Sequence, residues 1–360
     1  MDVAEGIVEN RVGSDVEQLI EEEELIEEEE VIEEEVELVE PRDDENEENE
    51  INLLNWLNLG FYIVNVAVTY AVGVGGILGK GRTNSDISEK YKTLVTPKGT
   101  AFAIWAVIFG SQGVFVIAQL FSKYRATRSV QKGVGYWYVA VCVFQSAWSF
   151  AFGYEVFWLA VLLMSFIWIS LVGILYNQYY IMSERDNILD YFLLRFPFDI
   201  HAGWITVALL LNVNVLVVNE KAKSSIELST AIVSLATLWA VSVFVLFALT
   251  KTANFTVAGV FIWALSFIAL ELNNEDNKKI RAKFSPEIIT ALHDTAIVLA
   301  IGISTEVVVR LIMNIVTMCK PKNSSIGIEE EITELSPSDN VHGDDDDDKL
   351  VPLLNDTDAV

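Results

Sequence analysis

The sequence has few of the residues on which covalent and metal-based chemistry depends. It has only two cysteines in 360 residues, Cys142 and Cys319. They lie far apart in apolar or juxtamembrane sequence, which excludes a disulfide framework and a cysteine metal motif. The chain also lacks a phosphate-binding glycine loop, a nucleophile elbow and any metal-ligand spacing. We therefore expect no metal site, no catalytic residue and no enzymatic activity.

Basic residues are also scarce, with 24 Lys and Arg against 51 Asp and Glu and a net charge of −27. Binding to nucleic acid needs a basic face, so nucleic acid is excluded as a partner. The excess of acidic residues is confined to the two ends of the chain. Residues 1–50 have 24 acidic and 2 basic side chains, and residues 321–360 have 12 acidic and 2 basic side chains. Residues 51–320 have 15 acidic and 20 basic side chains, which makes the middle of the chain slightly positive.

The acidic ends are predicted to be disordered tails. The first tail reads LIEEEELIEEEEVIEEEVELVE, in which apolar pairs recur about six residues apart. That spacing matches no helical stripe, and repulsion among the glutamates opposes compaction. The alternative is that a short motif in a tail docks on a basic protein partner.

Between the tails, the chain is dominated by apolar runs of about twenty residues, long enough to cross a hydrocarbon core of about 30 Å. In lipid the backbone must satisfy its own polar groups, and the runs lack the alternation of a barrel strand, so each run is predicted to be helical. The fold class is therefore an all-α polytopic membrane bundle of about eight helices in the lipid bilayer. The predicted spans are 54–78, 99–121, 134–155, 157–178, 197–218, 228–249, 254–272 and 288–316.

An even number of spans places both tails on the same side of the membrane. Basic residues in the connecting loops number nine on the tail side and eleven on the other side, so the positive-inside rule gives no preference. The N-terminus lacks a basic segment followed by an apolar run, so we expect no signal peptide, which favours cytosolic tails.

Two prolines mark predicted helix starts. Pro97 precedes the second span and Pro197 opens the fifth. Proline fits the first turn of a helix because its missing N–H would have no intrahelical partner there.

The nine tryptophans all lie between residues 56 and 263. Those near span ends fit interfacial anchoring. Trp105, Trp148 and Trp204 instead occur beside small or polar residues within the spans. Indole rings on facing helices offer flat surfaces to a large planar or sterol-like ligand, and simple packing between helices is the alternative.

Several polar residues fall within or at the ends of spans. Gln145, Asn212 and Asn214 lie deep in the third and fifth spans, where buried amides usually join helices by hydrogen bonds. Asp199 and His201 lie at the mouth of the fifth span. A single histidine near an interface is weak support for a haem ligand.

The last span contains charged residues at helical spacing. Glu306 and Arg310 are four residues apart, so they can form an ion pair on one face. An intramembrane pair is a functional candidate, and mutual neutralisation within the bundle is the alternative. His293 and Asp294 are adjacent, so we expect them to point in different directions.

Three segments resemble the motifs of a known membrane family. Residues 94–105, LVTPKGTAFAIW, are similar to the start of the second helix in the tryptophan-rich sensory protein/translocator protein (TspO/MBR) family. Residues 144–152, FQSAWSFAF, resemble its third-helix motif, and residues 197–212, PFDIHAGWITVALLLN, its fifth-helix motif. Their order and spacing match the first five predicted spans, over about residues 54–218. The chain thus divides into a tail (1–50), a TspO/MBR-like bundle (51–218), three additional helices (219–320) and a second tail (321–360).

The resemblance implies a five-helix bundle that binds porphyrin, haem or sterol-like ligands. Gln145 stands where the family more often has asparagine, and Asp199 and His201 add polar groups at the pocket mouth. No resident cofactor is expected, so porphyrin or haem would be a ligand, and a homodimer is a further expected partner. Candidate ligand-binding residues are Pro97, Gly99, Phe102, Trp105, Gln145, Trp148, Pro197, His201, Trp204, Ala208 and Asn212.

The leading hypothesis is a membrane protein that binds or transports a hydrophobic planar ligand, tetrapyrrole or sterol-like, in a tryptophan-lined pocket. It predicts that Trp105, Trp148 and Trp204 face one cavity. The second hypothesis is a secondary transporter that uses Glu306 and Arg310 in a water-filled path. The third is a membrane anchor whose acidic tails recruit a basic protein.

Overall fold

The computed structural model describes residues 50–77, 81–181, 187–248 and 253–319. The chain divides into two compact units, residues 1–313 and 314–360, and the contacts below lie within the first. The predicted disorder of both tails lies outside the described residues, apart from Glu50.

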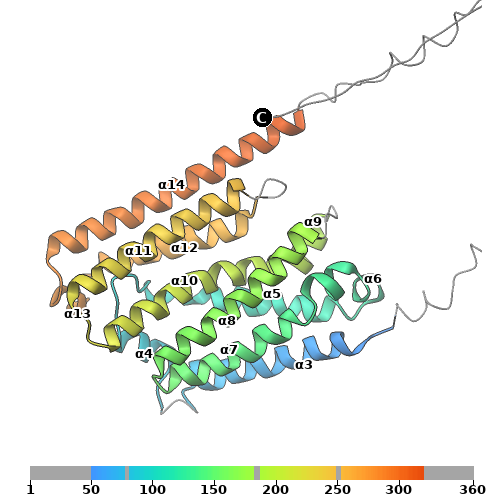
Figure 1. The fold of residues 1–360 in the computed structure, drawn as a ribbon, viewed down its shortest axis with the longest axis horizontal. Helices are drawn as coiled ribbons and strands as arrows, with labels where there is room; N and C mark the ends of the chain where they lie inside the picture. Colours follow the sequence, from blue (N-terminus) through green and yellow to red (C-terminus); the bar gives the residue numbers. More distant parts are fainter. Residues whose placement is uncertain (1–49, 78–80, 182–186, 249–252, 320–360) are drawn as a thin grey trace, which may run out of the picture. The chain divides into compact units, whose positions relative to one another are not determined.

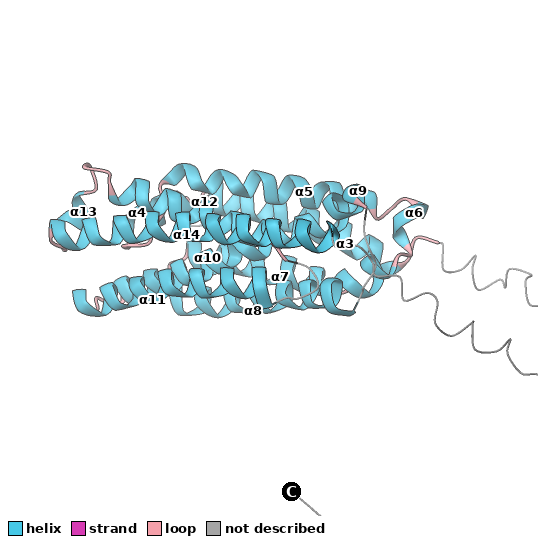
Figure 2. Cartoon of the chain, turned by 90° about the horizontal axis from the view of Figure 1, so that it is seen from above, coloured by secondary structure: helices cyan, strands magenta, loops and turns pink. Residues whose placement is uncertain are grey.

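Every regular element in the described ranges is helical (Figure 1, Figure 2), which confirms the all-α class. Several helices continue into a π-helical turn (η1, η4 and η6) or begin from one. The elements are α3 (Leu53–Val68), η1 (Thr69–Val74), α4 (Asn84–Lys90), η2 (Gly99–Ala103), α5 (Ile104–Ala118), α6 (Ser122–Arg125), η3 (Ser129–Val134), α7 (Trp137–Gly153), α8 (Phe157–Tyr176), η4 (Asn177–Ile181), α9 (Ile188–Asp190), η5 (Tyr191–Arg195), α10 (Phe196–Asn219), α11 (Ser224–Val243), η6 (Phe244–Ala248), α12 (Phe255–Leu272), α13 (Lys278–Arg281) and α14 (Pro286–Cys319).

Each of the eight predicted spans corresponds to a long helix. Within the described ranges, seven helical segments have the length and hydropathy needed to cross a membrane. The eighth, α7, has 17 residues and packs against α3 and α8. At 1.5 Å per residue it is about 25 Å long, somewhat short of a full hydrocarbon core. The chain is thus an integral, multi-pass membrane protein.

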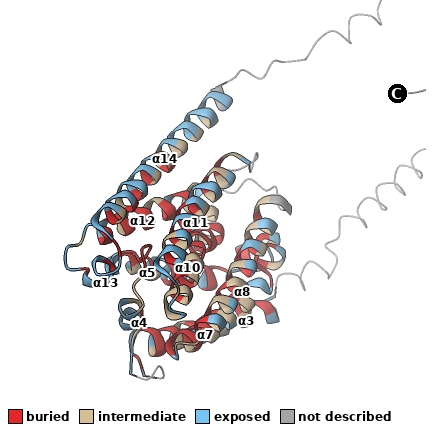
Figure 3. Cartoon of the chain, turned by 60° about the vertical axis from the view of Figure 1, so that its left-hand side comes forward, coloured by how far each residue is buried: buried red, intermediate tan, exposed pale blue. Residues whose placement is uncertain are grey.

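Helix α10 is the central helix of the bundle, because it packs against α5, α8, α11 and α12. In its most apolar window 67% of the residues are buried, compared with 17% for α14 (Figure 3). Gly203 allows α12 to approach closely, since a Cβ at Gly203 would lie 3.0 Å from the Cβ of Val260. Small residues at such crossings bring helix backbones together in membranes.

Polar contacts join the last helices to α10 and to the start of the second span. The Asn214 side chain donates to Ser234 Oγ on α11 (2.8 Å). The Trp263 indole of α12 donates to the carbonyl of Ala101 (3.1 Å), and the Lys98 amide donates to the carbonyl of Phe267 (3.0 Å). These bonds are made between segments far apart in sequence and hold the bundle in one arrangement.

The α7–α8 connection is a tight hairpin, and Glu155 lies at its centre with φ of 62°. A non-glycine residue in this left-handed region costs about 1 kcal/mol or more. Its carboxylate accepts hydrogen bonds from Lys90 Nζ (2.6 Å) and Tyr91 OH (2.7 Å) and forms an ion pair with Arg82. The hairpin is thereby fastened to the segment that follows α3.

The same ion cluster changes the pKa of Glu155. Partial burial raises this pKa, but hydrogen bonds from Lys90 and Tyr91 and the charges of Lys90 and Arg82 outweigh burial, so the net pKa is lowered. Nearby, Lys92 pairs with the buried Glu271 at the end of α12 (2.7 Å) and with Glu89 (2.6 Å). The charged groups at this end of the bundle thus connect α4, α7 and α12.

We predict that Gly203→Ala destabilises the protein by about 1–3 kcal/mol, because the added methyl group overpacks the α10–α12 contact. The matched control is Gly110→Ala on α5, where a Cβ meets nothing within 4 Å. That variant should be neutral or slightly stabilising, since alanine favours a helix. Apparent thermal midpoints in detergent compare the two, and equal midpoints would contradict the close packing at Gly203.

We also predict a loss of stability at low pH that depends on Glu155. Because its folded-state pKa is lowered, its contribution is present above the unfolded-state pKa of about 4.3 and is lost as pH falls through the folded-state value. The wild type should therefore lose more thermal stability between about pH 5 and pH 3 than Glu155→Gln. The exposed Glu275→Gln variant should follow the wild type, and identical curves for all three proteins would exclude this role for Glu155.

Candidate functional site

Aromatic side chains of α5 and α10 form a cluster between the two helices. The Trp105 ring lies edge-on to His201 (centroids 5.8 Å apart) and to Trp204 (6.4 Å). Phe102 packs edge-on against Trp204 at 5.7 Å, and Trp105 also stacks on Phe109 at 5.4 Å. Four of these five residues are among the predicted ligand-binding residues, and the structure brings them together.

Two polar atoms of this cluster are buried without partners. His201 is 0% exposed and Trp204 is 1% exposed, whereas Trp105 is half-buried. Within the described part of the chain, neither His201 Nε2 nor Trp204 Nε1 has a hydrogen-bond partner. An unpaired buried polar group costs about 1–3 kcal/mol, so two of them on one helix face require an explanation.

The other ring nitrogen of His201 is held by a short relay. Tyr138 OH on α7 donates to Gln112 Oε1 on α5 (3.3 Å), and Gln112 Nε2 lies 2.8 Å from His201 Nδ1. All three side chains are buried. Neither Gln112 nor Tyr138 was predicted from the sequence. Gln112 lies seven residues after Trp105 and therefore on the same helical face, a spacing that could have identified it.

A second part of the site lies further along α10. His201, Trp204, Ala208 and Asn212 recur at spacings of three and four residues, so they share one face. Trp148 Nε1 on α7 donates to Asn212 Oδ1 at 3.2 Å. This bond between two buried side chains joins α7 to α10, which is the role expected for a buried amide in a membrane helix.

Gln145 precedes Trp148 by three residues and is equally buried, but its contacts differ. Within the described ranges, neither the Oε1 nor the Nε2 of its amide has a hydrogen-bond partner. The inner faces of α7 and α10 therefore present three side chains with unused hydrogen-bonding capacity: Gln145, His201 and Trp204.

The predicted scaffold prolines and glycine lie at helix starts, with one difference. Pro197 occupies the first turn of α10, as predicted. Pro97 lies outside the first turn, because η2 begins at Gly99 with Lys98 as its N-cap. The chain before η2 is buried from Thr93 to Pro97 and includes a turn in which the Thr96 amide donates to the Thr93 carbonyl (3.2 Å). Lys98 is also non-helical, with ψ of 139°, so the helix starts only at Gly99.

Asp199 is fully buried in the first turn of α10 and accepts hydrogen bonds from several segments. Its donors are Tyr179 OH (2.6 Å), Tyr191 OH (3.2 Å) and Asn254 Nδ2 (2.8 Å). Tyr191 OH is also 2.6 Å from Thr256 Oγ1. Asp199 thus joins α10 to η4, η5 and α12, and its oxygens are occupied by protein donors rather than directed to a ligand.

Glu306 makes contacts that the sequence could not indicate. Its Oε1 accepts from Trp239 Nε1 (2.8 Å) and its Oε2 accepts from Ser242 Oγ (2.9 Å), both on α11. Arg310, one turn further along α14, is half-buried. The carboxylate therefore lies in a helix contact between α11 and α14, the arrangement expected of a structural tether.

The expectation for His293 and Asp294 is wrong. His293 Nδ1 lies 2.9 Å from Asp294 Oδ1, so the two side chains meet despite being adjacent in α14. The short Asp294 side chain is 65% exposed and turns along the helix surface to reach the imidazole, which places the pair outside the bundle interior.

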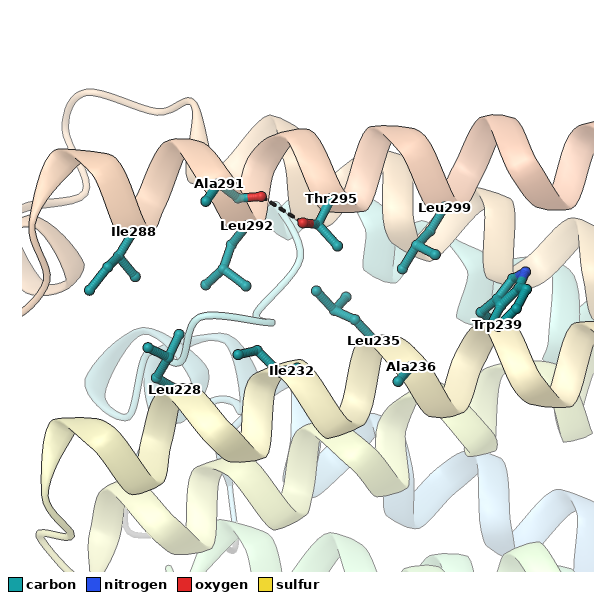
Figure 4. Close-up of a pocket in the computed structure, with 10 residues that line it drawn as sticks. All are labelled: Leu228, Ile232, Leu235, Ala236, Trp239, Ile288, Ala291, Leu292, Thr295 and Leu299. Atoms are coloured by element: carbon teal, nitrogen blue, oxygen red, sulfur yellow. Dashed lines mark hydrogen bonds between the residues drawn. The ribbon is translucent and has the colours of Figure 1, made fainter.

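An apolar groove of about 460 Å³ lies between α11 and α14 (Figure 4). Its lining residues are Leu228, Ile232, Leu235, Ala236, Trp239, Ile288, Ala291, Leu292, Thr295 and Leu299. The hydroxyl of Thr295 donates to the Ala291 carbonyl of its own helix (2.7 Å). A second apolar cavity of about 390 Å³ lies between α5, α10 and α12. Trp105, Trp148 and Trp204 line neither space, so a single cavity shared by the three indoles stays a prediction.

The fold and the site define a polytopic α-helical membrane protein whose interior combines aromatic rings with buried polar groups. The family model for TSPO-like proteins matches residues 55–305, so the chain belongs to the TSPO-like protein family. The family assignment made from the three motifs is confirmed, and the match also includes α11, α12 and much of α14. Comparisons with curated proteins and with solved structures gave no match.

A matched pair of substitutions separates the paired indole from the unpaired one. Trp148→Phe removes the donor to Asn212, so we predict that it destabilises the ligand-free protein about 1–2 kcal/mol more than Trp204→Phe, which removes an unpartnered N–H. Both substitutions delete a similar ring volume from a buried position. Thermal unfolding in detergent measures the difference in stability between the two variants. Equal losses of stability would contradict the finding that Trp204 Nε1 has no hydrogen-bond partner.

Proposed function

We propose that this protein binds a hydrophobic planar ligand, tetrapyrrole or sterol-like, between α5, α7 and α10, and that it does so without catalysis. The observation that supports the proposal most strongly is that three side chains of α7 and α10 have buried polar atoms without partners: Gln145, His201 and Trp204. Ligand sites in proteins are mostly aromatic and apolar with a few polar groups that fix orientation. The cluster of Phe102, Trp105 and Trp204 has this composition.

The groove between α11 and α14 supports the proposal less well. It has volume, but its lining is apolar and its one hydroxyl is already bonded within α14. A surface of this kind attracts lipid chains without fixing the orientation of a ligand. Transport driven through Glu306 also has less support, because the carboxylate is engaged by Trp239 and Ser242.

Protoporphyrin IX is the probe that tests the proposed site. We predict saturable binding to the detergent-purified protein, and about tenfold weaker binding to the Trp105→Phe/Trp204→Phe double variant, because the aromatic walls are reduced. Affinity is taken from the change in porphyrin absorption, since the substitutions themselves alter protein fluorescence.

The control for this experiment is Trp158→Phe, which changes a tryptophan that is 63% exposed at the start of α8. Its affinity should equal that of the wild type. Absence of saturable binding to folded wild-type protein would contradict the tetrapyrrole proposal, and equal weakening in the control would move the ligand away from the α5–α10 cluster.

A further inference from the structure

We propose that His201 acts in this site as a hydrogen-bond donor through Nε2–H, and that the site therefore selects planar ligands with a peripheral hydrogen-bond acceptor, a carboxylate or carbonyl oxygen. The inference rests on the proposed function, since it names the ligand chemistry that the α5–α7–α10 site recognises. It assigns to His201 a role in specificity rather than in metal binding.

The relay from α7 fixes which ring nitrogen carries the proton. Tyr138 OH donates to Gln112 Oε1, so the amide presents its Nε2–H₂ to His201 Nδ1 at 2.8 Å. Nδ1 must then accept, because two N–H groups cannot hydrogen-bond to each other. The proton of the imidazole lies on Nε2, which is the nitrogen without a partner.

A second donor lies on the same helical face. Trp204 follows His201 by three residues, and its indole nitrogen can only donate. Both rings contact Trp105, with centroids 5.8 Å and 6.4 Å apart, so the two N–H groups belong to one aromatic cluster. Two buried donors beside aromatic walls complement an acceptor at the edge of a flat molecule.

The same tautomer disfavours coordination of iron. A metal binds an imidazole nitrogen through its lone pair, and a protonated Nε2 has none to offer. If Nε2 were an axial ligand, Nδ1 would be expected to donate to a carboxylate, a carbonyl or water. In the structure Nδ1 instead faces an amide nitrogen. A free-base porphyrin and its iron complex are therefore expected to bind with similar affinity.

Three porphyrins with the same ring separate the alternatives. Protoporphyrin IX has carboxylates, its dimethyl ester keeps carbonyl acceptors without charge, and octaethylporphyrin has only alkyl groups at its periphery. We expect the first two to bind the wild type at least about tenfold more tightly than octaethylporphyrin, because a site built around hydrogen-bond donors rejects analogues that leave them unpaired.

Substitutions at His201 test the residue directly. His201→Phe should weaken binding of protoporphyrin IX and its ester about tenfold and leave octaethylporphyrin unchanged, which also shows that the variant is folded. His201→Gln, which keeps an N–H donor, should restore most of the affinity. The absorption spectrum of bound haem should be the same in wild type and His201→Gln.

The outcomes distinguish this inference from the proposed function. If all three porphyrins bind equally and His201→Phe changes none of them, the site stands and the role of His201 is overturned. A haem spectrum that changes with His201→Gln would make His201 an iron ligand and would equally overturn the proposal. If folded wild-type protein binds none of the porphyrins, both the inference and the proposed function fail.

Discussion

The structure depends on the requirement that polar groups removed from water and placed in lipid find partners within the protein. Most of the buried side chains meet it. Asp199 accepts three hydrogen bonds from other segments, and Asn214 joins α10 to α11. Each interhelical hydrogen bond stabilises the fold by only about 0.6–2 kcal/mol, but a buried polar group without a partner destabilises it by a similar amount. Together these bonds therefore select one arrangement of helices. On α7 and α10, Gln145, His201 and Trp204 are exceptions, and a bound ligand with acceptors would pair the His201 and Trp204 donors.

Helix α10 connects the parts of the molecule. One of its faces presents His201, Trp204 and Asn212 toward α5 and α7, and Gly203 lets α12 pack closely on another side. The family match is not confined to the first five spans, since it extends through α11, α12 and much of α14. The α14 helix differs, since it is mostly exposed and is tethered to α11 through Glu306.

Composition and periodicity were sufficient to predict the helical class and the positions of the spans, because an apolar run of about twenty residues permits little else in lipid. The motifs also identified Phe102, Trp105 and Trp204, which the structure brings together with His201. What the sequence could not supply were contacts across long separations, such as those of Gln112 with His201 and of Glu306 with Trp239. Local rules also misplaced Pro97, which lies before η2 rather than in its first turn, and missed the contact of His293 with Asp294. Surrounding packing and side-chain rotation determine these two details.

The most direct test of the account is a cryo-EM map of the full chain in lipid nanodiscs with saturating protoporphyrin IX. The account predicts planar ligand density between α5, α7 and α10, in contact with Trp105 and with an acceptor oxygen beside His201 Nε2 and Trp204 Nε1. Density confined to the apolar groove between α11 and α14, with the α5–α10 aromatic cluster unchanged, would contradict it.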